Sequence, residues 1–290
     1  MTDNKVALVT GASRGAGAGI ARGLGELGYT VYVTGRTTVP GDATGWDGSV
    51  LPGTFMETAA QVTALGGHGV GLACDHEDDS QVEALFARIL KDEGRLDLLV
   101  NNAAYIHSQL IEKKPFWEKS LDAVKILDVG LRSAYVASWH AAKIMVPQGR
   151  GLIAFGSSFG ASCYMHGPAY GAQKAGLDKF AHDMEHDLRG TGVATVSIWM
   201  GPLITERSLI ASQTHPEQYK EFIATAENPE FTAHILDAID QAPNRDALSG
   251  SVLIGAEIAK ILGVTDKGKD RPSYRDMLGN PPGKNPAAVY

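Results

Sequence analysis

Residues 6–27 read VALVTGASRGAGAGIARGLGEL. The apolar run Val6–Val9 predicts a short strand, and the helix-forming residues 16–27 predict a helix. Glycines in the turn between them let backbone amides approach a diphosphate, while the first turn of the helix faces its negative charge. The stretch therefore predicts a strand, a phosphate-binding turn and a helix that together hold a dinucleotide. The glycines of the turn are Gly11, Gly15 and Gly17.

The rest of the chain repeats this alternation of apolar runs and helix-length segments. Because such strands join through right-handed crossovers, the pattern predicts an α/β fold with a doubly wound parallel sheet of about seven strands and helices on both faces. With 290 residues and 44 % hydrophobic content, we expect one domain over residues 1–290. Further strands are expected at 30–34, 69–73, 96–100, 152–155, 193–199 and 251–254, and helices at 58–65, 80–91, 117–146 and 167–189.

Three segments interrupt the alternation. Residues 37–54 are rich in Gly, Pro, Thr and Asp and predict a surface insertion beside the adenosine end of a dinucleotide. Residues 206–246, with helix-like stretches at 216–226 and 230–239, are placed where a mobile cover could close over a substrate. The tail, 267–290, is expected to run along a partner subunit or to be partly disordered.

Composition narrows the classes of ligand and of location. The formal net charge is −7, and no lysine or arginine cluster is present that could follow phosphates, which argues against nucleic acid or an anionic membrane as partner. The two cysteines, Cys74 and Cys163, have no spacing typical of a disulfide framework or a zinc site. Neither a signal peptide nor 18 uninterrupted apolar residues occur. We expect a soluble cytoplasmic protein with small-molecule ligands and no metal.

A tyrosine and a lysine predict the chemistry. Tyr170 and Lys174 lie four residues apart on one face of a predicted helix, so the ammonium can favour the phenolate and lower a pKa that is ordinarily about 10. Ser157 ends a predicted strand thirteen residues before Tyr170, and Ser158 is the alternative serine. A YxxxK pair alone more often marks a solvated helix face. Together with the glycine turn it indicates hydride transfer with Tyr170 as general acid or base and Ser157 orienting the substrate oxygen.

These motifs resemble those of the short-chain dehydrogenases/reductases over residues 5–255. The similarity rests on TGxxxGxG from Thr10, Asn101-Asn102-Ala103-Ala104, Ser157 and Tyr170-Gly-Ala-Gln-Lys174. FWE (116–118), ILDVGLR (126–132) and SGSVLIG (249–255) resemble the branch that contains dehydrogenase/reductase SDR family member 1 and its bacterial relatives. The resemblance implies a single-domain Rossmann fold, an NAD(P)-dependent oxidoreductase, and a homodimer or homotetramer built on the two long helices.

The resemblance also implies roles for single residues. Asp75 would bind the adenine amino group, Asn101 would fix the strand beneath the cofactor, and Thr205 would hold the nicotinamide carboxamide. Lys174 would bind the nicotinamide ribose. In isolation, Asp75 and Asn101 fit a helix cap and a turn former better. The complete expected set for the cofactor is Gly11, Ser13, Arg14, Gly15, Ala16, Gly17, Arg36, Asp75, Asn101, Ala103, Tyr170, Lys174 and Thr205.

Charge indicates the choice of cofactor. A carboxylate at the end of the second strand would bind ribose hydroxyls and repel a 2′-phosphate, but this chain has Thr34-Gly35-Arg36 there and Arg14 in the glycine turn. Two guanidinium groups favour NADP(H), and NAD(H) stays possible. The alternative is that Arg36 is a solvated loop residue.

Residues after the strand ends indicate the substrate. Most are bulky and apolar, so a hydrophobic ketone or aldehyde, or the matching alcohol, fits better than a sugar phosphate. They are Tyr105, Ile106, His107, Phe159, Tyr164, Met165, Met200 and Leu203.

Other interpretations stay open. Many family members have an asparagine where this chain has Gly130, which puts the usual proton route in question; a carbonyl exposed by a glycine kink could hold the same water. His182-Asp-Met-Glu185-His186 spells a zinc-protease motif but fits a solvated helix face. A regulator that binds NADP(H) without turnover is the main rival function, and a methyltransferase explains the motifs poorly.

Overall fold

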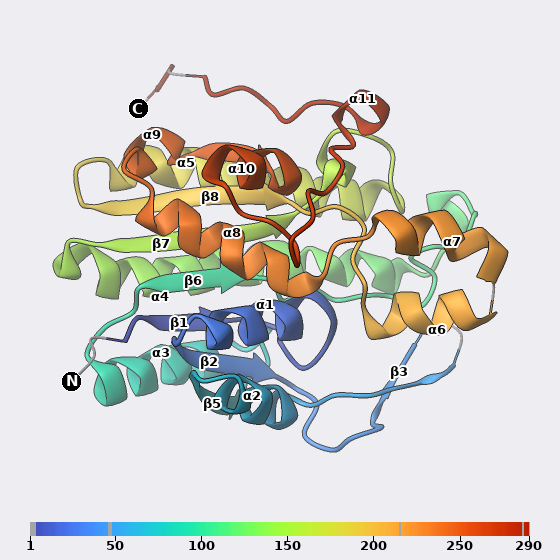
Figure 1. Ribbon diagram of the computed structural model, residues 1–290, viewed down its shortest axis with the longest axis horizontal. Helices are drawn as coiled ribbons and strands as arrows, with labels where there is room; N and C mark the ends of the chain where they lie inside the picture. Colours follow the sequence, from blue (N-terminus) through green and yellow to red (C-terminus); the bar gives the residue numbers. More distant parts are fainter. Residues whose placement is uncertain (1–3, 46–47, 215, 286, 290) are drawn as a thin grey trace.

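The computed structural model describes residues 4–45, 48–214, 216–285 and 287–289 (Figure 1). Residues 46–47 of the insertion, 215 of the expected cover, and 286 and 290 of the tail lie outside the described residues. Seven parallel strands form one sheet in the order β5-β2-β1-β6-β7-β8-β9, which confirms the predicted fold class. The strands are β1 (Val6–Val9), β2 (Thr30–Gly35), β5 (His68–Ala73), β6 (Leu98–Asn101), β7 (Gly151–Ser157), β8 (Val193–Trp199) and β9 (Ser251–Ile254).

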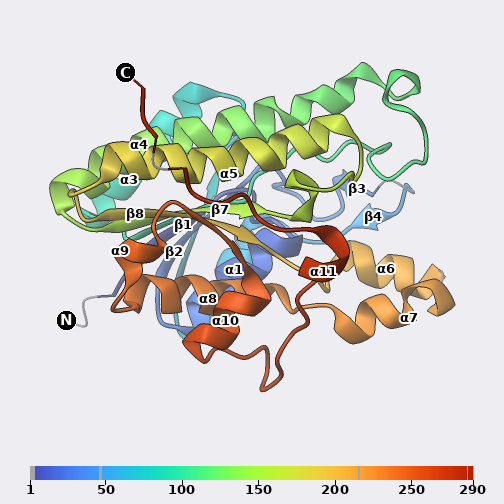
Figure 2. The same cartoon turned by 90° about the horizontal axis from the view of Figure 1, so that it is seen from above.

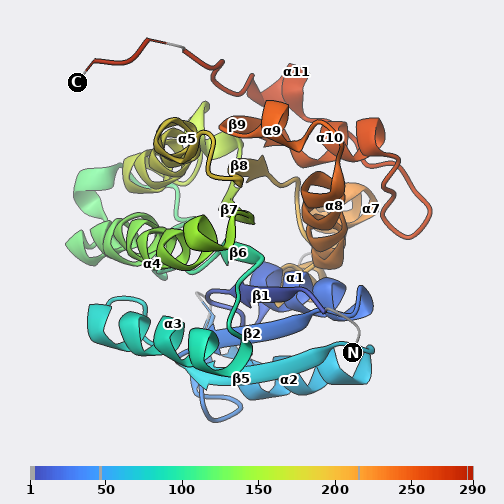
Figure 3. The same ribbon diagram turned by 90° about the vertical axis from the view of Figure 1, so that its left-hand side faces the viewer.

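Helices cover both faces of the sheet (Figure 3). Successive side chains of a strand point to opposite faces, so Ala7 and Val9 of β1 join one apolar cluster while Val6 and Leu8 join the other. Both faces of the sheet are therefore buried, which is why all four residues of β1 are apolar. The first cluster includes α1 (Gly15–Glu26), α2 (Phe55–Ala64), α8 (Pro229–Gln241) and α10 (Gly255–Leu262); the second includes α3 (Asp79–Glu93), α4 (Ser133–Gln148) and α5 (Pro168–Leu188).

The strand order reverses between β1 and β6, because the chain builds β2 and β5 on one side of β1 and the later strands on the other. Ligands of doubly wound sheets bind at the carboxyl edge beside such a reversal. Here the backbone N–H of Thr10, just after β1, donates to the Val100 carbonyl of β6 at 3.1 Å. The loops that follow these two strands are thereby held side by side.

The predicted helix at 117–146 is wrong over its first half. Short 3₁₀ turns occupy Phe116–Glu118 and Leu121–Ile126, and α4 begins only at Ser133. Two residues between them leave helical geometry: Val129 has φ −100° and ψ 91°, and Gly130 has φ 147° and ψ −39°. The positive φ of Gly130, a conformation that favours glycine, is the kink suggested at this residue, and it interrupts the helix before α4.

The insertion and the cover acquire structure of their own. The insertion folds into a small antiparallel hairpin, β3 (Ala43–Thr44) with β4 (Val50–Leu51). The cover begins with α6 (Glu206–Thr214), which the sequence analysis missed, and continues with α7 (Pro216–Thr225). Both lie beyond the carboxyl ends of the strands (Figure 1). In contrast, α8 packs on α1 so closely that a Cβ on Gly19 would lie 2.1 Å from Pro229. From the segment 206–246, the first two residues of α6, Glu206 and Arg207, line the cleft described below.

The described part of the tail packs on its own chain (Figure 2). Arg271 pairs with buried Asp266 at 2.7 Å, and Arg275, in α11 (Arg275–Leu278), pairs with Glu257 of α10. Further along, the Lys284 ammonium donates to the Ser249 carbonyl at 2.5 Å, next to α9 (Arg245–Leu248). Through these contacts the described part of the tail lies along the surface of its own chain.

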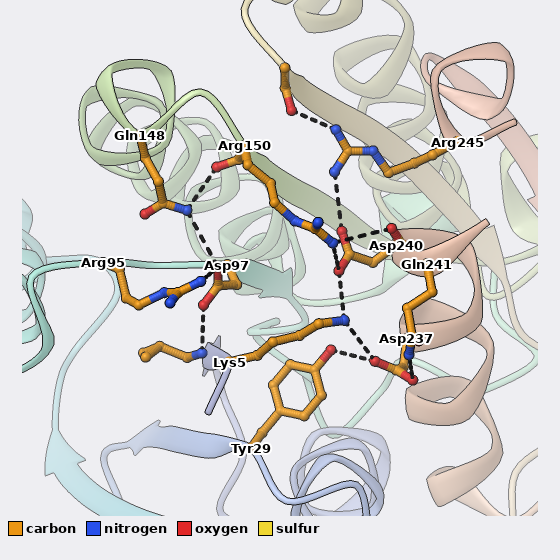
Figure 4. Close-up of polar contacts among 12 residues, drawn as sticks. Lys5, Tyr29, Arg95, Asp97, Gln148, Arg150, Asp237, Asp240, Gln241 and Arg245 are labelled. Carbon is orange, nitrogen blue, oxygen red and sulfur yellow. Dashed lines mark hydrogen bonds and ion pairs between the residues drawn. The ribbon is translucent and has the colours of Figure 1, made fainter. Parts of the chain in front are cut away.

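A buried ionic cluster holds the amino edge of the sheet, opposite the glycine turn (Figure 4). Asp240 of α8 is 5 % exposed and accepts from Lys5 at 2.9 Å and from Arg150 at 2.8 Å. Arg245 contacts its other oxygen at 3.2 Å. Lys5 and Arg150 immediately precede β1 and β7, so one carboxylate joins α8 to two strand starts.

Candidate active site

The glycine turn after β1 lies against the loop after β6. A Cβ on Gly11, which has φ +65°, would approach the Ala103 Cα to 2.6 Å, and a Cβ on Gly17 would approach the Asn102 amide nitrogen to 2.4 Å. The Asn102 side chain donates to the Gly11 carbonyl at 2.9 Å and to the Thr10 carbonyl at 3.0 Å. Glycine is required here because the two backbones meet without room for a side chain.

These loops form the floor of a cleft of about 390 Å³. The cleft brings together every residue expected to contact the cofactor except Asn101. Asn101 is buried and donates to Ser138 on α4 at 3.0 Å, so it supports the strand and does not reach the cleft. Lining residues that sequence reasoning missed include Asn102, Gln173, Glu206 and Arg207. Those expected are Gly11, Ser13, Arg14, Gly15, Ala16, Gly17, Arg36, Asp75, Ala103, Tyr170, Lys174 and Thr205.

Ser158 and Tyr170 form the hydroxyl pair of the site. Their oxygens lie 3.0 Å apart, with the serine just after β7 and the tyrosine in the first turn of α5. A Cβ on Gly160 would lie 2.6 Å from the Tyr170 ring, so this glycine lets the ring pack against the loop. The Lys174 ammonium lies 5.4 Å from the centre of the same ring and donates to the Gly156 carbonyl at 2.9 Å.

Ser157 takes a different direction from Ser158. It is fully buried, and its hydroxyl donates to the Lys174 carbonyl at 3.3 Å. It also contacts Asp178, whose carboxylate accepts from Ser197 at 2.6 Å and from Trp199 at 2.8 Å. Alternating strand residues point to opposite faces, so only one of two adjacent serines can reach Tyr170. The structure brings Ser158 to the tyrosine and places Ser157 in a polar cluster beneath α5.

Burial governs the charges of the tyrosine and the lysine. It lowers the pKa of Lys174 to about 8, against an opposing contribution from Asp178. It also raises the pKa of Tyr170, while the hydrogen bond from Ser158 acts in the opposite direction. The tyrosine is therefore held as a phenol, ready to donate a proton, and the expected lowering of its pKa by Lys174 does not dominate in this arrangement.

Arg14 and Arg36 lie at the far end of the cleft. The Arg14 guanidinium donates to the carbonyls of Pro52 and Gly53 at 3.0 and 2.8 Å and to Thr37 at 3.0 Å, so it holds both ends of the insertion. Arg36 has a side chain 57 % exposed and lies 3.7 Å from the Asp75 carboxylate. Of the two cations, Arg36 is the more accessible to a ligand.

Thr205, expected at the carboxamide, caps the helix that follows it. Its hydroxyl accepts from the Ser208 N–H at 3.3 Å, and its own N–H donates to the Ser208 hydroxyl at 2.8 Å. The next residue, Glu206, accepts from the Gly15 N–H at 2.8 Å. This contact spans most of the chain, and no local sequence signal announces it.

Gln173 of α5 contacts Gly130, which lies before the start of α4. The Gln173 amide nitrogen donates to the Gly130 carbonyl at 3.0 Å, while its oxygen is buried and has no partner within the described residues. The kinked carbonyl suggested as a water site is thus already bonded on one side by Gln173. A carbonyl oxygen has two lone pairs, so one acceptor position is left.

Of the eight residues expected around the substrate, two line the cleft. Ile106 and Met200 line the cleft, together with the apolar residues Ile126 and Val129. Phe159 is buried against Trp199 with ring centres 5.0 Å apart, and Tyr164 is 81 % exposed. The other six expected residues do not line this cleft: Tyr105, His107, Phe159, Tyr164, Met165 and Leu203.

Within the described ranges, nowhere do three or more His, Cys, Asp or Glu side chains lie together so that they could hold a metal ion. Glu185 of the HxxEH motif pairs with Arg189 at 2.9 Å on the surface of α5. Within the described residues, none of the helices combines the length and apolarity needed to cross a bilayer.

Comparison with known proteins shows the family of the chain. The family model of the short chain dehydrogenases matches residues 5–215. Dehydrogenase/reductase SDR family member 1 of Mus musculus is 38 % identical over 90 % of this chain and 83 % of its own length, and that of Homo sapiens is 37 % identical over 91 % and 83 %.

Solved structures share the fold. A crystal structure from Xanthomonas campestris, provisionally assigned as a dehydrogenase, superposes with a TM-score of 0.74 at 23 % identity, covering 92 % of each chain. The chain therefore belongs to the short-chain dehydrogenases/reductases, a family of oxidoreductases, in the branch that contains dehydrogenase/reductase SDR family member 1.

Proposed function

We propose that the protein is an NADP(H)-dependent oxidoreductase that interconverts a hydrophobic ketone or aldehyde and the corresponding alcohol, with Tyr170 as general acid and base. The observation that carries the proposal is the 3.0 Å contact of the Ser158 hydroxyl with the hydroxyl of Tyr170, which lines the cleft together with the glycine turn. A carbonyl oxygen that accepts from both hydroxyls would be polarised and would receive its proton from the phenol.

The cleft fits a nicotinamide dinucleotide. A Cβ at Gly11 or Gly17 would collide with the loop after β6, and the Gly15 N–H already binds an anionic oxygen, that of Glu206. Gly11, Ser13, Gly15 and Ala103 would hold the diphosphate, Asp75 the adenine, Thr205 the carboxamide and Lys174 the ribose. When bound, the dinucleotide supplies or accepts the hydride.

The chain's own residues would manage the proton. Ser158 orients the substrate oxygen toward Tyr170, and Tyr170 donates its proton in reduction or takes one in oxidation. Lys174, whose pKa burial lowers to about 8, can release a proton near neutral pH and restore the phenol. The Gly156 carbonyl fixes the ammonium at 2.9 Å, and the Gly130 carbonyl has one acceptor position for a water behind the helix.

Preference for NADP(H) follows from the end of β2. Gly35 and Arg36 occupy the place where a carboxylate would favour NAD(H), and the Arg36 guanidinium is largely exposed. Ile106, Val129 and Met200 favour an apolar substrate. A homodimeric or homotetrameric enzyme in the cytoplasm is the corresponding expectation for the whole protein.

Oxidation of NADPH by a panel of carbonyl compounds tests the proposal. We expect turnover with hydrophobic ketones or aldehydes and little with sugar phosphates, read from the nicotinamide absorbance. Tight NADPH binding without oxidation across a wide panel would favour the non-catalytic regulator, and absence of dinucleotide binding would overturn the proposal.

A further inference from the structure

The side chain of Glu206, from a distant part of the chain, caps the amino terminus of α1. Its carboxylate accepts from the backbone N–H of Gly15, the first residue of α1, at 2.8 Å. The residue before the helix, Arg14, makes no side-chain cap of its own. The unpaired N–H groups at a helix start bind anions, so a carboxylate is well placed here.

Two arginines share the field of this carboxylate. Burial lowers the pKa of both Arg14 and Arg207, and the negative charge of Glu206 opposes that lowering in each case. Both guanidinium groups line the same cleft as Gly15 and Glu206. The Glu206 carboxylate therefore lies at a helix start and within the electrostatic field of two guanidinium groups that line the same cleft, an environment that also favours a phosphate.

We propose that the Glu206 carboxylate holds the position that one phosphate group of the dinucleotide takes, so that Glu206 is an internal competitor that sets the affinity for the cofactor. The inference rests on the proposed function, since it assumes a dinucleotide in this cleft. A phosphate and a carboxylate carry similar charge toward the same N–H and the same arginines, and both cannot occupy one position.

The exchange would also release α6. Glu206 is the first residue of α6, and the paired bonds between Thr205 and Ser208 stiffen that turn, so the side chain and the helix start move together. With the carboxylate displaced, the contact between α6 and α1 at Gly15 is lost, while Arg207 stays beside the incoming phosphate. Binding of the cofactor is thereby linked to movement of the α6–α7 cover.

Binding measurements with Glu206→Gln test the proposal. An amide keeps the size of the side chain but binds the N–H and the arginines more weakly than a carboxylate, so we expect NADPH and NADH both to bind about tenfold more tightly. Both cofactors should gain alike because both carry the diphosphate. Glu217→Gln, an equal change of charge at an exposed residue of α7, is the matched control and should leave both dissociation constants unchanged.

Hydrogen exchange without added nucleotide gives a second, independent readout. In Glu206→Gln the amides of α6 should exchange several times faster than in the wild type, and those of the Glu217→Gln protein should not. Unchanged or weaker binding by Glu206→Gln, or unchanged exchange in α6, would overturn the inference while wild-type NADPH binding still supports the proposed function. Failure of wild type and variant alike to bind either dinucleotide would overturn both.

Discussion

The hydroxyl of Ser158 lies 3.0 Å from the phenolic oxygen of Tyr170, whereas the hydroxyl of its neighbour Ser157 bonds to the backbone of Lys174. The spacing of thirteen residues before Tyr170 favours Ser157 as the partner of the tyrosine. The strand geometry at the end of β7 favours Ser158 for that role. We therefore propose that Ser158 orients the substrate oxygen and that Ser157 holds the helix that carries Tyr170 and Lys174.

The two serines should respond differently to removal of the hydroxyl. Ser158→Ala is expected to lower kcat/KM by about 10² or more, because the substrate oxygen loses one of its two donors. Ser157→Ala is expected to cost about 1 kcal/mol of unfolding free energy and to change kcat little. Steady-state kinetics and urea unfolding of both variants check this; the opposite pattern would return the role to Ser157.

Arg36 should distinguish the two cofactors. Arg36→Ala removes the accessible cation near the adenosine end, so KM for NADPH should rise about tenfold or more while KM for NADH changes little. Arg14 is present in both the wild type and the variant, and its guanidinium donates to the carbonyls of Pro52 and Gly53 in the insertion. Equal effects on the two cofactors would show that Arg36 does not contact a 2′-phosphate.

Much of this architecture was predictable from local patterns. The limits of β1, β8 and β9 agree with their apolar runs, and the glycine turn was identified from its place between a strand and a helix. Such signals lie within a few neighbouring residues, so one sequence suffices to find them.

Long-range contacts were not predictable in the same way. The bond between Glu206 and Gly15 joins residues 191 apart, and the bond between Gln173 and Gly130 depends on a kink at φ 147°. Adjacent serines are equivalent in the sequence, and only the pleat of β7 separates them. These features arise from the packing of distant segments, which periodicity does not encode.

Lys174 should lower stability near neutral pH. Its pKa in the folded protein is about 8, below the ordinary value near 10.5, so the folded state resists protonation that the unfolded chain accepts. Lys174 therefore lowers the free energy of unfolding by its largest amount below pH 8, and this penalty decreases as the pH rises from 8 to 10.5. Lys174→Met should therefore gain stability relative to wild type at pH 7, and the gap should narrow at pH 10. Urea unfolding at both values checks this; a gap that widens with pH would contradict it.

The cluster at the amino edge should matter for stability and not for catalysis. Burial opposes ionisation of Asp240, but Lys5 and Arg150 outweigh it and hold the pKa of this carboxyl below its usual range. Asp240→Asn removes the carboxylate that Lys5, Arg150 and Arg245 share and should cost about 3 kcal/mol at pH 7. Because a depressed pKa stabilises only the ionised form, the difference from wild type should shrink as pH falls below 4.

A matched control for this cluster is Asp246→Asn. Asp246 has a side chain 93 % exposed and lies 3.7 Å from the same Arg245, so its loss should cost little. Thermal or urea unfolding of the two variants compares them directly. Equal stabilities, or a loss of kcat in Asp240→Asn at a temperature where it is folded, would contradict the structural role.

The most direct test of the account is the activity of Tyr170→Phe, measured together with its binding of NADPH. The variant keeps the ring that packs on Gly160 and loses only the hydroxyl that faces Ser158. We predict a wild-type dissociation constant for NADPH, within about threefold, and a fall of kcat by at least about 10³ with the best carbonyl substrate. Retention of more than about a tenth of wild-type kcat would remove Tyr170 from the chemistry and contradict the proposed mechanism.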